Sequence, residues 1–516
     1  MKVDSANPAK VVVIGGGIGG LAAAILLAKS GRSVRLLEKN ESLGGRARVF
    51  TSAGFRFDMG PSWYLMPDVF EHFFELVGRR ITDYLTLHRL APSYRIHLPG
   101  HSEPVDLTSD PTRDGGTLAR FEADAPAKLD RYLKRIAHEY ALSIKSFIYR
   151  NANHPLDMAT WSTVRDGSRL PLLRSMHRHL GAYFHSGEVR RILEYQTLFL
   201  GSPPHRTPGI YGAMNHVDFA MGVFYPEGGI GAVVGALERL AVEFGVEIRT
   251  SAPVRTIETP IAGHRRQPTV RSVELESGER LECDMVVSNA DIWFTETRLL
   301  EPSAQSYPEP WWEPKVTSPT AAILYLGVEG RCDGLVHHNL VFPSDWERSF
   351  ADMFERPALP NEPSLYVCCP SRTDPTVAPE GCENLFVLQP LSPKLVVGEP
   401  EWARLREMLL GTLETRFGVT GIRERILTER RYHGPDFASD YNAFRGNALG
   451  GLAHTLSQTS VFRPRNVSPK VEGLYYVGAG TNPGIGMPMC LVSAELLLKA
   501  VSGDRSDGPL RAFPEG

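Results

Sequence analysis

The pattern of apolar and polar positions predicts a strand, a helix and a second strand at the start of the chain. Residues 11–14 are all apolar without alternation, which is typical of a strand buried on both faces. Residues 21–29 are rich in Ala and Leu, both strong helix formers, and Gly31 stands just past their end. A second, mostly apolar run at 34–37 ends at Glu38. We therefore expect a strand–helix–strand unit here.

The turn between the first strand and the helix has the spacing G-x-G-x-x-G, formed by Gly15, Gly17 and Gly20. In a dinucleotide fingerprint the first glycine allows the tight turn, the second lets the backbone approach a pyrophosphate, and the third lets helix pack close to strand. The helix N-terminus offers free N–H groups and a positive dipole end to the phosphates. Glu38 follows Gly20 at close to the ~20-residue spacing expected for the acid that binds the ribose. Its charge would repel a 2′-phosphate, so the pattern indicates an unphosphorylated adenosine dinucleotide.

The residues after Glu38 narrow the choice of dinucleotide. They read KNESLGGRARVF and then GFRFDMGPSW. This run resembles the extended motif of flavin-dependent desaturases and amine oxidases, in which the GGR segment lies along the pyrophosphate and ribityl chain of FAD. Arg46 has the planar, five-donor head that pairs with phosphate in a bidentate way. Asp58, at the end of a predicted short strand 55–58, is expected to bond backbone N–H groups of a turn, with a catalytic role as the alternative.

Most of the remaining chain alternates between helical and strand patterns. Segments 94–98 and 103–107 predict a hairpin, and 119–147 and 174–200 predict amphipathic helices. These helices are expected either to face a core or to cap a cavity and lie against a bilayer, with 174–200 the preferred membrane contact. Strand and helix patterns return at 224–290 and again at 474–503, where a glycine-rich loop joins a strand to a helix.

Composition excludes several classes of protein. The chain has 516 residues, 42% of them hydrophobic, and a formal net charge of −3, so no nucleic-acid partner is expected. The six cysteines form no C-x-x-C pair and the histidines no H-E-x-x-H pattern, so no metal site is predicted. No stretch approaches the ~20 apolar residues of a membrane span, apart from a run at 11–28 whose glycines fit the fingerprint instead. We expect a cytoplasmic protein with reduced thiols.

Several motifs together resemble the bacterial-type phytoene desaturases, the FAD-dependent carotenoid desaturase family. Besides the N-terminal motifs, the resemblance rests on these runs: YPEGGIGAVVGALERL, VVSNAD, SRTDPTVAPEGCENLFVL, FRPRN and YYVGAGTNPGIGMPMCLVSAE. The N-terminal motifs are shared with amine oxidases and retinol saturases, whereas the TDP-x-x-APEG and GAGTNPG-x-GMP segments are more specific. Asn482 departs from the family loop, which more often reads THPG, and leaves the number of desaturations open.

The resemblance implies a fold and a cofactor site. The expected fold class is α/β (α+β overall), with a Rossmann-like FAD-binding domain of the amine oxidase and desaturase type beside a mixed-sheet and helical substrate domain. The FAD-binding domain is expected to comprise 8–70, 222–298 and 440–503, the substrate and membrane-facing domain 71–221 and 299–439, and 504–516 a disordered tail. The candidate cofactor-binding residues are Gly15, Gly16, Gly17, Gly19, Gly20, Glu38, Lys39, Gly44, Gly45, Arg46, Gly60, Val254, Gly480, Gly484 and Met487.

The implied activity is FAD-dependent desaturation of phytoene or a related acyclic carotene collected from a membrane surface by a peripherally bound enzyme. Related isomerases, saturases, ketolases and hydroxycarotenoid dehydrogenases share most of the motifs, and an amine oxidase is a further alternative. A non-enzymatic alternative is a prenyl-lipid-binding protein like the Rab GDP-dissociation inhibitors, which lack intact phosphate-binding glycines. The sequence assigns no catalytic base, although Asp58 and His433 are weak candidates, and it gives no oligomeric state.

Overall fold

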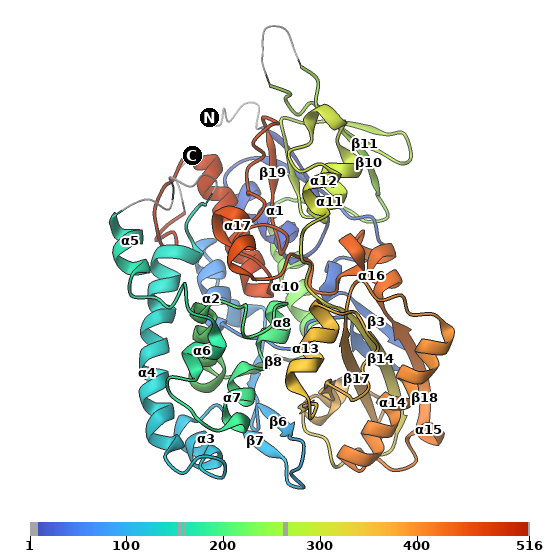
Figure 1. The fold of residues 1–516 in the computed structure, drawn as a ribbon. Coiled ribbons are helices and arrows are strands. Elements are labelled where there is room, and N and C mark those ends of the chain that lie inside the picture. Colours follow the sequence, from blue (N-terminus) through green and yellow to red (C-terminus); the bar gives the residue numbers. More distant parts are fainter. Residues whose placement is uncertain (1–8, 153–156, 158–160, 262–266, 514–516) are drawn as a thin grey trace.

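A five-stranded parallel sheet contains the strands predicted at the start of the chain (Figure 1). The computed structural model describes residues 9–152, 157, 161–261 and 267–513. In spatial order the strands are β19 (Leu474–Tyr476), β13 (Met285–Ser288), β1 (Lys10–Ile14), β2 (Ser33–Leu37) and β9 (Glu247–Arg249). The sheet therefore joins three segments that lie far apart in the sequence, and it places the carboxyl ends of β1, β13 and β19 side by side.

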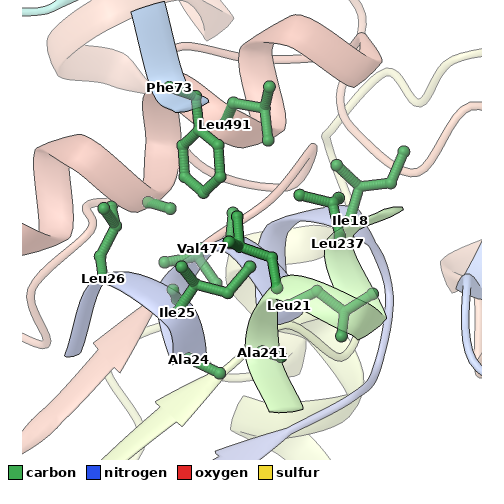
Figure 2. Close-up of a cluster of buried hydrophobic side chains, with 14 of the residues drawn as sticks. Ile18, Leu21, Ala24, Ile25, Leu26, Phe73, Leu237, Ala241, Val477 and Leu491 are labelled. Atoms are coloured by element: carbon green, nitrogen blue, oxygen red, sulfur yellow. The ribbon is translucent and has the colours of Figure 1, made fainter. Parts of the chain in front are cut away.

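Helix α1 (Ile18–Lys29) is buried over most of its length between two other helices. It contacts α10 (Ile230–Glu243) and α17 (Met487–Ser502), and Phe73 of α2 (Pro67–Leu76) reaches the same cluster (Figure 2). Small and aliphatic residues suit this helix because its neighbours pack on nearly every side. The predicted strand–helix–strand unit is confirmed, with the helix starting three residues earlier than its apolar run.

A seven-stranded mixed sheet forms the second large element of the fold. Its strands, in spatial order, are β18 (Ile426–Tyr432), β14 (Thr320–Glu329), β17 (Cys382–Leu391), β16 (Leu365–Cys368), β15 (His338–Val341), β6 (Tyr94–His97) and β7 (Val105–Leu107). Only the β15–β6 pair among these is parallel, and the predicted hairpin over 94–107 is confirmed as β6 and β7. Helix α14 (Glu399–Phe417) packs its Leu residues against one face of this sheet.

Three smaller sheets complete the strands of the described chain. They are the ribbon of β3 (Val49–Ser52) with β4 (Phe55–Asp58), the ribbon of β5 (Leu87–Arg89) with β8 (Phe224–Pro226), and an antiparallel sheet of β10 (Val254–Glu258), β11 (Ser272–Leu275) and β12 (Arg280–Glu282). The predicted fold class, a parallel α/β sheet beside a mixed sheet with helices, is confirmed. The division into two domains at the boundaries given above stays a prediction.

The described side chains of the segment 174–200 do not form the exposed apolar face that a membrane contact needs. It forms α6 (Met176–Leu180), α7 (Gly187–Glu194) and α8 (Thr197–Leu200). Its large apolar side chains point into the core shared with β6, β14 and β16, among them Met176, Leu180 and Phe184. The preference for this segment as the membrane contact is wrong because its amphipathic pattern reflects burial against the mixed sheet, and the core-facing alternative holds.

The expected disordered tail also differs from the structure over residues 504–513. The buried Lys499 ammonium group donates to the carbonyls of Tyr149 and Ser506, and Asp507 pairs with Arg150 at 2.8 Å. The Leu510 side chain is 7% exposed, and its N–H donates to Glu495. The polar sequence of the tail does not predict these long-range contacts. The last three residues of the expected tail, 514–516, lie outside the described residues.

Candidate functional site

One cavity of about 900 Å³ joins the fingerprint loop to the interior of the mixed sheet. Its walls come from the loops after β1, β2, β13 and β19, from the segment 59–66 that follows β4, and from the mixed sheet. Cavities at the carboxyl ends of parallel strands are the usual ligand sites of such sheets, and this volume lies at the upper end of the ~300–1,000 Å³ range for small-molecule pockets. The cavity is therefore the main candidate site.

Two glycine-containing loops, after β1 and β19, meet around the side chain of Asn289, which directly follows β13. A Cβ atom on Gly17, Gly19 or Gly478 would lie 2.8, 2.6 or 2.5 Å from an atom of the Asn289 amide. Gly20 is closer still to its neighbour, because a Cβ there would lie 2.0 Å from the carbonyl oxygen of Gly15. The glycines are thus required by packing of the loops on one another, in addition to any approach to a ligand.

Glu38 is buried at the end of β2 and ties the fingerprint loop to the next turn. Its Oε2 accepts from the Gly16 N–H at 2.7 Å, and its Oε1 accepts from the backbone N–H and the side-chain amide of Asn40, both at 2.9 Å. A carboxylate has about four lone-pair positions, so it can accept a further hydrogen bond from a ligand hydroxyl in the cavity. Glu38 therefore lies where the fingerprint predicts it, and it also holds the loop.

Most of the candidate cofactor-binding residues line this one cavity. Those that do are Gly15, Gly17, Gly19, Glu38, Lys39, Gly44, Gly45, Arg46, Gly60, Val254, Gly480 and Met487. Gly16, Gly20 and Gly484 do not line it. Gly16 faces Leu43 and donates to Glu38, Gly20 packs on the loop, and a Cβ on Gly484 would lie 2.5 Å from Nε2 of His454. These three glycines serve the shape of the loops.

Arg46 is half-buried and bound to the segment 447–448. Its Nε donates to the Ala448 carbonyl at 3.0 Å, and its guanidinium lies 5.2 Å from the ring centroid of Tyr441. Burial lowers the pKa of Arg46 from its usual value, and the nearby Asp291 opposes this. Lys39 is held in the same way, with Nζ donating to the Ser439 carbonyl at 2.6 Å. Both cations join the N-terminal motif to the C-terminal segment at the cavity wall.

The residues present fit an FAD molecule. Its phosphates need close backbone approach and cations, and its ribose diol needs a carboxylate, all of which the cavity supplies. Asn482, in the late glycine loop, also lines the cavity, and its buried Nδ2 has no hydrogen-bond partner within the described part of the chain. An unpaired buried donor costs about 1–3 kcal/mol, so this amide favours an acceptor in the cavity, such as a flavin carbonyl.

Beyond the glycine loops the cavity has mainly apolar walls. One part is lined by mixed-sheet and core residues, namely Trp63, Ile323, Tyr366, Phe386, Leu388 and Phe437. Another part is lined by Phe147, Ile148, Leu170, Leu172, Ile210, Leu456 and Met489. A space of this kind accepts a long hydrocarbon, whereas its walls offer few partners to the ammonium group of a small amine.

Asp218 is a cavity carboxylate that the sequence analysis missed. Its Oδ1 accepts from the Tyr94 hydroxyl at 3.0 Å, and its Oδ2 accepts from the Tyr195 hydroxyl at 2.8 Å and from the Gln196 amide. Burial raises the pKa of Asp218 to about 6, although these three donors oppose the shift. The only signal in the sequence is a single acid between apolar residues in HVDFAM, which does not reveal that its partners are distant tyrosines.

The two weak catalytic candidates lie outside the cavity. Asp58 accepts from the N–H groups of Ile230 and Gly231 at 2.8 and 2.9 Å, so it caps the N-terminus of α10. The expected bonding to backbone N–H groups is present, but across the fold instead of within a turn. His433 precedes α16 (Gly434–Tyr441), and its ring stacks on Trp402 at 5.4 Å between centroids.

Comparisons with known proteins agree with this geometry. The family of flavin-containing amine oxidoreductases matches residues 18–496. A carotenoid 3,4-desaturase of Haloarcula japonica is 43% identical over 96% of this chain and 98% of its own. A zeta-carotene-forming phytoene desaturase of Myxococcus xanthus is 37% identical over 95% of this chain and 93% of its own.

A solved structure shares the fold at low identity. An oxidoreductase of Methanosarcina mazei superposes with a TM-score of 0.60 at 17% identity, covering 94% of this chain and 98% of the other. Together with the cavity, these matches make the protein an FAD-dependent oxidoreductase. The chain belongs to the flavin-containing amine oxidoreductases and, within them, to the carotenoid desaturases that its motifs resemble.

Proposed function

We propose that the protein is a carotenoid desaturase that dehydrogenates phytoene or a related acyclic carotene with FAD. The observation that carries this conclusion is the single cavity in which the glycine loops continue into apolar and aromatic walls. When bound, FAD supplies a two-electron acceptor for a hydride. The chain's own part is to hold a polyene in register against that acceptor and to exclude water.

The relatives support the reaction class and differ in the carotene they act on. One is named for 3,4-desaturation and another for forming zeta-carotene. Both names denote a desaturation, which removes two hydrogens from a C–C bond, so the reaction class is the same. An isomerase or saturase built on the same motifs would leave conjugation unchanged or shorten it, which separates these alternatives by their products.

The experiment presents purified, FAD-loaded protein with phytoene and with a more desaturated acyclic carotene in liposomes. We expect a product whose absorption lies at longer wavelengths, because each new double bond extends conjugation, resolved by chromatography with diode-array detection. Protein stripped of FAD is the control and should form none. Geometric isomers alone, or products of shorter conjugation, would contradict the desaturase assignment.

The cofactor-binding residues are the second part of the proposal. The cavity-lining glycines and Arg46 receive the pyrophosphate, Glu38 receives the ribose diol, and Val254 borders the adenine end. The domain that holds FAD comprises 8–70, 222–298 and 440–503. Burial raises the pKa of Cys490 to about 12, so this cavity thiol stays protonated, which supports non-covalent binding.

Replacing Glu38 by Gln should weaken FAD binding about tenfold or more, because a charged hydrogen bond contributes ~1.5–3 kcal/mol. The measurement is the Kd of FAD for the reconstituted apoprotein by flavin fluorescence. Glu247→Gln is the matched control, since this acid is exposed on β9 of the same sheet and pairs with Arg35. Equal affinities for Glu38→Gln and wild type would show that another group holds the ribose.

Asp218 is proposed as the acceptor of the proton that leaves with the second hydrogen. It lines the cavity, and its partners Tyr94 and Tyr195 pack against Trp63, whereas the other lining acids, Glu38, Glu276, Asp291 and Asp440, lie near the glycine loops or their flanking segments. Its raised pKa, about 6, suits a base that must be ionised near neutral pH and still bind a proton well.

The rate of a single turnover should therefore rise with pH through about 6, because only ionised Asp218 accepts the proton. Asp218→Asn should lower this rate by about 10²-fold or more and remove the rise. Asp58→Asn is the matched control: burial also raises the pKa of Asp58 to about 6, but its carboxylate lies outside the cavity. If the rise is lost with Asp58→Asn and kept with Asp218→Asn, the assignment is wrong.

Peripheral membrane contact is proposed at an apolar rim formed by Trp161, Leu173, Leu456 and Phe462. These side chains are 79%, 91%, 48% and 59% exposed, although large apolar groups are usually buried. Leu456 lines the cavity, and so do Leu170 and Leu172, next to Leu173. The segments of Leu173 and Phe462 are joined through 209–211, because Gly209 N–H donates to the Arg174 carbonyl and Tyr211 bonds Thr459. The helix that begins at Trp161 contacts the segment 144–148, which also lines the cavity.

This rim would place the apolar part of the cavity against the lipid that holds the substrate. None of the helices in the described part of the chain has the length and apolar character needed to cross a bilayer. A few exposed apolar side chains bind a membrane weakly and reversibly, which suits an enzyme that must collect and release an insoluble chain.

The double substitution Leu173→Asp and Phe462→Asp should reduce flotation of the protein with liposomes several-fold, since each adds a charge where an apolar group would enter lipid. FAD content should not change. Val396→Asp is the control, because Val396 is 87% exposed and does not line the cavity. Flotation equal to wild type in the double variant, or loss in the control, would rule out this rim.

A further inference from the structure

Three metal-binding side chains meet behind the wall of the large cavity. His337 directly precedes β15, His338 is its first residue, and Cys368 is the residue of β16 paired with His338. Each residue offers one ligand atom, a nitrogen from each imidazole and the sulfur of the cysteine, and these three atoms lie within 4.8 Å of one another. All three residues are buried. This cluster is independent of the FAD loops.

Each imidazole has one nitrogen fixed and the other unpaired. Nδ1 of His337 lies 2.7 Å from the Thr373 hydroxyl, and Nδ1 of His338 lies 2.8 Å from the Tyr366 hydroxyl. Nε2 of both rings is buried without a hydrogen-bond partner in the described chain. Histidines that bind metals are held in this way, with one nitrogen bonded to an outer group and the other carrying the free lone pair.

A small void adjoins the cluster. It measures about 20 Å³ and is lined by His337, Cys368, Asp58 and Ser62 among others. One water needs about 10–15 Å³ of such space, so the void has room for a single water as a fourth ligand. With a thiolate at Cys368 and a carboxylate at Asp58, two negative charges would face a divalent cation, which offsets the cost of burying it.

We propose that His337, His338 and Cys368 bind one zinc ion, with a water completing a tetrahedral site. Zinc accepts two imidazoles and a thiolate in this geometry, and binding converts the thiol to a thiolate and releases one proton. The ion would join β15 to β16 and brace the wall behind Ser62 and Phe386, which also line the large cavity. The sequence contains no C-x-x-C spacing that would predict this metal site, because its ligands come from two paired strands.

The first test is the zinc content of the purified, FAD-loaded protein after equilibration with zinc sulfate and gel filtration, by inductively coupled plasma mass spectrometry. We expect about one zinc per chain in the wild type. Cys368→Ser and His337→Gln should reduce it at least tenfold. Cys369→Ser is the matched control: it changes the next residue, whose thiol donates to Glu383 at 3.0 Å, and it should keep the zinc.

The second test needs no variant, so a folding defect cannot obscure it. X-ray absorption at the zinc edge should give a single sulfur at about 2.3 Å and nitrogen or oxygen neighbours at about 2.0–2.1 Å. Zinc added to metal-free protein in weak buffer should release about one proton per ion. Wild-type protein that binds no zinc, a spectrum without sulfur, or zinc retained in both ligand variants would overturn the proposal.

Discussion

The close approach of two glycine-containing loops to the Asn289 side chain is the constraint on which the site depends. The loops after β1, β13 and β19 meet there, and a side chain on Gly17, Gly19 or Gly478 would collide with the Asn289 amide. Glu38 then ties the first loop to the turn after β2 through Gly16 and Asn40. Because three distant segments close one cavity wall, the cofactor site forms only when the whole parallel sheet has assembled. This makes binding of FAD and folding of this part mutually dependent.

The cavity changes character where it leaves these loops. Near the glycine loops, polar groups pair with one another or, like the Nδ2 of Asn482, have no hydrogen-bond partner within the described chain. The walls beyond Trp63 are mainly apolar. An apolar wall gives a polyene no directional contacts, so register along the chain depends on shape and on the few polar groups present, chiefly Asp218 and Gln196. A protein of this kind positions the substrate and lets the cofactor perform the oxidation.

Local patterns predicted much of this from the sequence, and long-range packing explains the rest. Three features could be predicted because each depends on neighbouring residues. The apolar run before Gly15 forms a strand, the fingerprint glycines form the loop after it, and Glu38 lies at the end of the second strand. Asp58 was expected to bond backbone groups, but its partner helix lies more than 170 residues away in the sequence. The amphipathic pattern of 174–200 is the same for a core face and a membrane face, so only the packing of Leu180 and Phe184 separates them. The local sequence around Asp218 shows only one acid between apolar residues, and the His337–His338–Cys368 cluster has no metal-binding spacing.

The most direct test of the account is anaerobic mixing of the FAD-loaded protein with an excess of its acyclic carotene in liposomes, followed through the flavin absorbance. If the cofactor in this cavity takes the hydride, the visible flavin band should bleach, with one new double bond formed for each flavin reduced and no added nicotinamide cofactor. Product formed without oxygen while the flavin band stays unchanged would contradict a desaturase and favour an isomerase on the same fold.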